Sequence, residues 1–259
     1  MFNLKMKSKF IGLIKKPFVR NVFTLSSGTA IAQVIVVVCS PIITRLYKPE
    51  VFGVLGIILA IAGIFQSIGS LSYDNAIVLP KKDEDAKAIF LLSLIISGTI
   101  AFLISLIFIF FDDKIISLLQ IEVVTQFVLL IPLWVFFAVC TDILEQWLTR
   151  KEQFRKKASI MIINTSVVNA SKIGAGLYSP SVFLLVFIAT FGYALNAVLL
   201  SFSQFSISRK GFENIKKANW FSFRHIYKMA KKYFDFPFYR APQLFVQSIS
   251  IKLPTLILA

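Results

Sequence analysis

The chain has 259 residues, of which 57% are hydrophobic and 16% are charged, and its formal net charge is +15. With a mean hydropathy of +0.77, this composition excludes an ordinary soluble domain and is typical of a bundle of membrane helices.

Six apolar stretches follow one another along the chain, and a seventh begins near Leu244 and runs to Ala259. About 20 apolar residues suffice for a helix to cross a bilayer. We therefore predict an all-α polytopic membrane protein, with a basic tail at 1–21, a six-span lobe at 22–205, a basic connector at 206–242 and the start of a seventh span at 243–259. The six expected spans are residues 22–44, 51–72, 88–111, 123–147, 159–177 and 181–205.

Loops that are rich in lysine and arginine alternate with loops that are poor in them. Of the 28 such residues, 23 lie in the N-terminal tail and in the loops after the second, fourth and sixth stretches. Short basic loops stay in the cytoplasm, so we expect a cytoplasmic N-terminus. This placement explains the charge better than nucleic-acid binding, for which basic clusters are also suited, so we expect anionic membrane lipids and no nucleic acid as partners.

Polar residues inside the stretches mark candidate cavity positions, because a buried dipole in lipid needs a partner or a wet passage. The first stretch carries Gln33. The second aligns Gln66, Ser70 and Asp74 at helical spacing, which predicts one polar stripe on one helix. The fifth carries Asn169 and Lys172. We take Gln33, Asp74, Asn169 and Lys172 as candidate substrate-cavity residues.

Two of the charged positions have alternative interpretations. Lys172 can hold an anionic ligand group, or it can extend its stem toward the outer interface. Asp142 and Glu145, three residues apart, can carry protons, bind a cation or pair with loop cations, and the pairing role is favoured.

Enzymatic signatures are weak. His225 is the single histidine, and the Asp83–Glu84–Asp85 cluster, whose spacing would suit a divalent cation, is flanked by lysines in a short loop. Phosphate loops, nucleophile elbows and metal-ligand spacings are not found. Cys39 and Cys140 fall within expected spans. We therefore expect no enzyme, no cofactor and no metal site.

The connector combines basic and aromatic residues. Phe221, Ile226, Met229 and Tyr233 predict an apolar face, and the cations at 224, 228, 231 and 232 predict a charged one. This pattern indicates a helix lying among lipid headgroups.

Several segments resemble the Wzx-type polysaccharide flippases of the MATE-related oligosaccharide exporter superfamily. They are the P-x-x-T-R-L-Y run at 41–47 with Phe52 and Gly53, the R-K-E-Q-F-R run at 150–155, and the D-F-P-x-Y-R-A-P run at 235–242. The resemblance implies a transporter that moves an oligosaccharide linked to undecaprenyl pyrophosphate across the bacterial inner membrane for O-antigen, capsule or exopolysaccharide synthesis. Other polysaccharide assembly proteins are further partners that it implies.

Members of that family have two six-helix lobes, whereas this sequence ends within the seventh stretch. From the resemblance we expect a fragment that does not flip lipid by itself. The alternatives are a cation-coupled multidrug antiporter of the same superfamily, using Asp74 or Asp142 as the coupling carboxylate, and a membrane-embedded glycan polymerase or glycosyltransferase.

Overall fold

The computed structural model describes residues 17–119, 130–205 and 222–258, and every regular element in these ranges is helical. The elements are α2 (Pro17–Leu46), α3 (Pro49–Ile68), α4 (Tyr73–Ala76), α5 (Asp83–Leu119), α6 (Leu130–Arg150), α7 (Phe154–Tyr178), α8 (Val182–Phe205), α10 (Phe223–Lys232), the π-helix η4 (Phe236–Arg240) and α11 (Ala241–Leu258).

Six of these helices are long and apolar enough to cross a membrane: α2, α3, α5, α6, α7 and α8. The prediction of an all-α polytopic membrane protein is confirmed. The seventh apolar stretch forms the helix α11 but is not among the six. Residues 123–129 of the fourth expected span lie outside the described residues.

The third span differs from its predicted end. The helix continues past residue 111 through Asp112 and Asp113 to Leu119. Asp112 and Asp113 therefore do not end the helix, because an aspartate inside a helix costs only roughly up to 0.7 kcal/mol relative to better helix formers.

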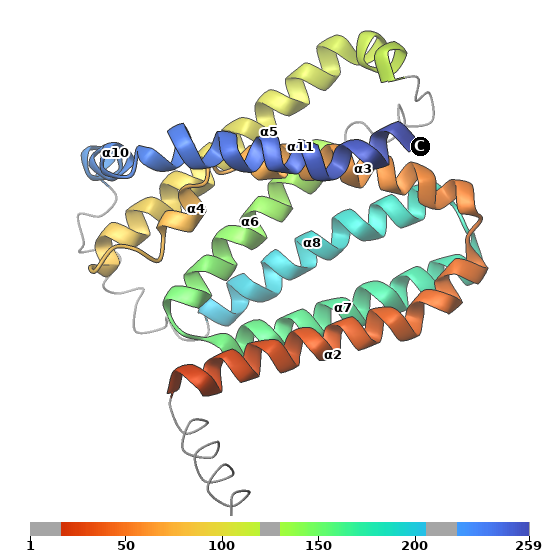
Figure 1. The fold of residues 1–259 in the computed structure, drawn as a ribbon, viewed down its shortest axis with the longest axis horizontal. Coiled ribbons are helices and arrows are strands. Elements are labelled where there is room, and N and C mark those ends of the chain that lie inside the picture. Colours follow the sequence, from red (N-terminus) through yellow and green to blue (C-terminus); the bar gives the residue numbers. More distant parts are fainter. Residues whose placement is uncertain (1–16, 120–129, 206–221, 259) are drawn as a thin grey trace, which may run out of the picture.

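The long helices run as a bundle in which α2 lies along α7, and α6 lies between α3 and α8 (Figure 1). The α2–α7 contact is close at Gly28, where an added Cβ would lie 2.5 Å from the Ala158 Cβ. Small residues at membrane-helix contacts permit this approach of the backbones. α11 packs along α3 on the opposite side of the bundle.

The largest buried cluster joins α3, α5, α6 and α8 with the short helix α4. It includes the fully enclosed side chains of Ile58, Ile77, Ile89, Ile131 and Leu185. Large apolar side chains such as Phe102, Phe110 and Phe202 are exposed on the outer surface. Since lipid chains solvate apolar groups, this exposed surface is what a membrane-spanning bundle presents to the bilayer.

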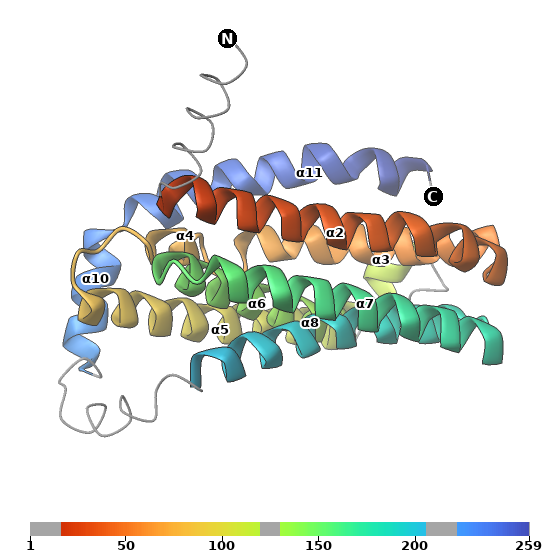
Figure 2. The ribbon, with the colours of Figure 1, turned by 90° about the horizontal axis from the view of Figure 1, so that it is seen from below.

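α10 lies across the end of the bundle, with its axis transverse to the long helices in both views (Figure 2). α10 packs on α5, and its Ile226 and Met229 are buried in the core cluster that also contains Ala88 and Ile89 of α5. The Tyr73 hydroxyl donates a 3.0 Å hydrogen bond to the carbonyl of Ala230. The predicted amphipathic helix is present, but its apolar face packs on protein. That this helix lies among lipid headgroups stays a prediction, and Phe221 lies outside the described residues.

Candidate functional site

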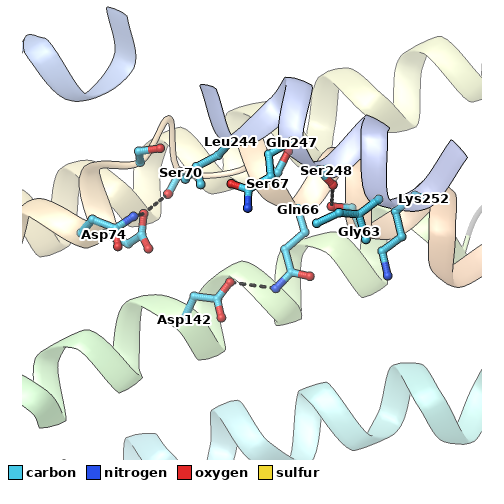
Figure 3. A pocket seen from close by; sticks show the side chains of 13 residues that line it. Gly63, Gln66, Ser67, Ser70, Asp74, Asp142, Leu244, Gln247, Ser248 and Lys252 are labelled. Atoms are coloured by element: carbon cyan, nitrogen blue, oxygen red, sulfur yellow. Dashed lines mark hydrogen bonds between the residues drawn. The ribbon is translucent and has the colours of Figure 1, made fainter. Parts of the chain in front are cut away.

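A cavity of about 360 Å³ lies where α3, the α4 segment, α6 and α11 meet (Figure 3). Most of its lining residues are polar and carry amides, hydroxyls, two carboxylates and one ammonium group. The lining residues are Gly63, Gln66, Ser67, Ser70, Ser72, Asp74, Asn75, Asp142, Leu244, Gln247, Ser248, Ile251 and Lys252.

On one wall, α3 and α6 are joined by a side-chain hydrogen bond. The Gln66 Nε2 atom donates to Asp142 Oδ2 at 2.8 Å. Both residues lie in apolar spans, where burying a polar side chain without a hydrogen-bond partner costs roughly several kcal/mol of free energy. The bond therefore fixes the carboxylate of α6 at the cavity wall, and one oxygen of each residue is left as a further acceptor.

The chain between α3 and α4 bends sharply at the cavity. Leu71 and Ser72 both adopt left-handed backbone conformations, with φ of 49° and 61°. Such conformations are costly for residues other than glycine, about 1 kcal/mol or more each, and they persist where surrounding contacts hold them. After this bend, Asp74 accepts a hydrogen bond from the Ser70 hydroxyl.

This bend corrects the prediction of one continuous polar stripe. α3 ends at Ile68, so Asp74 does not continue the helix that carries Gln66. All three predicted stripe residues, Gln66, Ser70 and Asp74, nevertheless line the cavity, because the bend returns the chain to it. Burial raises the pKa of Asp74, and the hydrogen bond from Ser70 opposes this shift.

The opposite wall is supplied by α11. The Ser248 hydroxyl donates a 3.2 Å hydrogen bond to the carbonyl of Gly63 on α3. A Cβ added at Gly63 would lie 3.3 Å from Lys252 Cε, so the glycine leaves room for the lysine side chain along α3. Lys252 is the cation of the cavity lining. In the described part of the chain, its ammonium group has no hydrogen bond or ion pair.

Of the four predicted cavity residues, the structure brings only Asp74 to this site, together with Asp142. Gln33 is exposed on α2. Asn169 is buried on α7, where its side chain donates to the carbonyl of Thr165 at 2.8 Å. Lys172, also on α7, accepts a 2.8 Å hydrogen bond at its carbonyl from the Tyr47 hydroxyl.

Three of the other predicted carboxylates, Glu145, Asp83 and Asp85, have basic partners. Glu145 forms a 2.8 Å ion pair with Lys157. Asp83 binds both Arg150 and Lys151, and Asp85 lies 3.1 Å from His225 on α10. Within the described ranges, no group of three or more His, Cys, Asp or Glu residues is placed to hold a metal ion.

Sequence reasoning missed Lys252 as a site residue. The signal was present, because a lysine within an apolar stretch is costly in a membrane and Lys252 is one of two such lysines in the expected spans. The position of Lys252 in the seventh stretch does not show which helix packs against that stretch. That information comes from the packing of α11 on α3.

The arrangement offers donors and acceptors on two facing walls of a hollow between membrane helices. Amide and hydroxyl groups bind sugar hydroxyls, and an ammonium group binds phosphate as a point charge.

The chain matches the family model described as polysaccharide biosynthesis protein over residues 18–258. No curated protein and no solved structure matches the chain significantly.

Proposed function

The chain belongs to the polysaccharide biosynthesis protein family, and we propose that it takes part in translocating a lipid-linked oligosaccharide across the bacterial inner membrane. In this proposal it acts as a Wzx-type flippase related to the MATE exporters. Its substrate is carried on undecaprenyl pyrophosphate, and its N-terminus is cytoplasmic. It is a transporter and not an enzyme.

The observation that carries the proposal is the polar cavity between apolar helices. A sugar headgroup keeps its hydrogen bonds in a passage lined by Gln66, Ser67, Gln247 and Ser248, while a polyprenyl chain remains among lipid chains outside the bundle. Without such a lining, each buried hydroxyl group would lose its partners on leaving water, which costs several kcal/mol per group, roughly.

In this proposal Lys252 receives the pyrophosphate. It is the cation in the cavity lining, and its ammonium has no protein partner among the described residues. A charged hydrogen bond from lysine to phosphate is stronger than a neutral one. Lys172, for which this role was one of two interpretations from the sequence, does not line the cavity.

A second candidate is a cation-coupled antiporter, and the observation that favours it is the pair of carboxylates in the same cavity, Asp74 and Asp142. Two carboxylates would bind a small cationic substrate or exchange it for a proton. The family match favours the polysaccharide role over this one.

Deletion of the gene in its native host tests the proposal. We expect surface polysaccharide to be lost and undecaprenyl-linked oligosaccharide to accumulate in the cytoplasmic leaflet, with both effects reversed when the gene is restored at its own locus. The lipid-linked sugar is measured by extraction and mass spectrometry.

Other outcomes would assign the other functions. Surface chains shortened to single repeat units would indicate a polymerase and contradict the flippase. Unchanged polysaccharide together with increased sensitivity to cationic drugs would favour the antiporter. Loss of polysaccharide without accumulation of a lipid-linked precursor would place the defect before translocation and would also contradict the proposal.

A further inference from the structure

The side of α10 that faces away from the bundle carries a compact set of cations. Arg224, Lys228 and Lys231 are exposed and follow one another with Tyr227 at intervals of three and four residues, which places all four on one stripe of the helix. This stripe lies opposite the buried Ile226 and Met229. α10 itself, FRHIYKMAKK, contains no carboxylate.

Large aromatic rings are exposed beside these cations. Phe223 is 81% exposed and Tyr227 is 71% exposed. Three more exposed aromatic residues follow in the segment that leads to α11: Phe234, Phe238 and Tyr239. In water, such a set of exposed rings would be unfavourable, since burial of each large side chain is worth about 1.5–3 kcal/mol.

The position of α10 explains how the rings and cations are used. The helix packs on the first part of α5, where that membrane span begins, and it lies transverse to the long helices. A helix at this place and in this direction lies in the plane of a membrane surface. Aromatic side chains favour the headgroup level, and basic side chains near anionic lipid gain about 1 kcal/mol each.

We propose that the exposed face of α10, formed by Phe223, Arg224, Tyr227, Lys228 and Lys231, binds the headgroups of anionic phospholipids. Ile226 and Met229 hold the helix on the protein, so lipid binding uses the side opposite these two residues. The helix is then held between the bundle and the leaflet. Since α10 leads through η4 into α11, lipid binding at this face steadies the helix that carries Lys252.

The test uses the full chain with Cys39 and Cys140 replaced by alanine and an environment-sensitive fluorophore attached at Tyr227→Cys. The protein is reconstituted in nanodiscs of phosphatidylcholine, with or without phosphatidylglycerol. Quenching by aqueous acrylamide and by brominated lipid chains reports whether position 227 faces water or the bilayer. We expect phosphatidylglycerol to lower acrylamide quenching and raise quenching by brominated lipid, and we expect high salt to reverse both changes.

Two double variants with equal loss of charge provide the matched comparison. Lys228→Gln with Lys231→Gln should abolish the response to phosphatidylglycerol. Lys81→Gln with Lys82→Gln, which removes two exposed cations from the loop before α5, should leave it intact. An identical response in both variants, or equal acrylamide quenching in both lipids, would overturn the proposal. None of these outcomes depends on the transported substrate.

Discussion

Gln66 of α3 and Asp142 of α6 are joined by a 2.8 Å hydrogen bond across one wall of the polar cavity. The bond links two membrane helices through groups that have few alternative partners in lipid. It gives both helices a fixed register beside α11, and the stability of the site therefore depends on a pair of side chains that are 76 positions apart in the chain.

Breaking this pair should destabilise the bundle. We expect Gln66→Ala to lower the free energy of unfolding by about 1–3 kcal/mol, because the Asp142 oxygen loses its donor while buried. A double-mutant cycle with Asp142→Ala, measured by thermal unfolding in detergent, should give a coupling energy of about 0.5–3 kcal/mol. Additive effects of the two substitutions would contradict the role of the bond.

Gly63 should control the position of Lys252. We expect Gly63→Val to displace the lysine stem, since even a Cβ there would lie 3.3 Å from Lys252 Cε, and to reduce surface polysaccharide in the complemented deletion strain. Gly98→Val is the matched control, because an added Cβ at Gly98 meets no atom within 4 Å. Equal transport by the two variants would show that the approach at Gly63 is unimportant.

The contact between α2 and α7 should tolerate no added methyl group at Gly28. We expect Gly28→Ala to cost about 1–3 kcal/mol, the usual effect of overpacking, because the new Cβ would lie 2.5 Å from Ala158 Cβ. Gly174→Ala on α7, which meets no atom within 4 Å, should be neutral or stabilising by up to about 1 kcal/mol. The melting temperatures of the two purified variants test this prediction. A larger fall in melting temperature for Gly174→Ala than for Gly28→Ala would contradict the close packing at Gly28.

Arg150 and Lys151 bind the same carboxylate but should differ in importance. The Arg150 side chain is only 10% exposed, and it also donates to the carbonyls of Ile77 and Pro80 at 3.3 and 2.6 Å. We expect Arg150→Ala to cost about 1–3 kcal/mol for each acceptor left unpaired. Lys151→Ala should cost less than about 1 kcal/mol, as for exposed ion pairs. Equal losses in thermal unfolding would contradict this account of the α4–α5 connection.

The stability of the bend after α3 should depend on pH through Asp74. Burial raises the pKa of this carboxyl group in the folded chain above its ordinary value. The stabilising contribution of the neutral acid is therefore present at low pH and is lost as pH rises through the raised pKa. We expect Asp74→Asn to melt increasingly above the wild type as pH rises over this range. Asp235→Asn, at an exposed position, is the control, and a pH-independent difference at Asp74 would contradict the prediction.

Hydropathy was sufficient to predict the fold class, because unpaired backbone groups are costly in lipid and an apolar stretch that crosses it therefore forms a helix. The site was less accessible. Asp142 and Asp74 were identified as polar residues in or beside apolar stretches. The bend at Leu71 and Ser72 could not be predicted, because neither position is a glycine or a proline. The choice between Lys172 and Lys252 depends on which helices touch, and single-helix patterns do not contain that information.

Translocation with Lys252 substituted tests the central claim most directly. Lys252→Gln and Lys48→Gln each remove one positive charge, and Lys48 is exposed at the start of α3, outside the cavity lining. With both variants restored at the native locus, we predict that Lys252→Gln lowers delivery of lipid-linked oligosaccharide to the outer leaflet by about tenfold or more, since a hydrogen bond to a charged group contributes about 1.5–3 kcal/mol. Lys48→Gln should match the wild type. Normal delivery by Lys252→Gln, at equal protein levels in the membrane, would contradict the account.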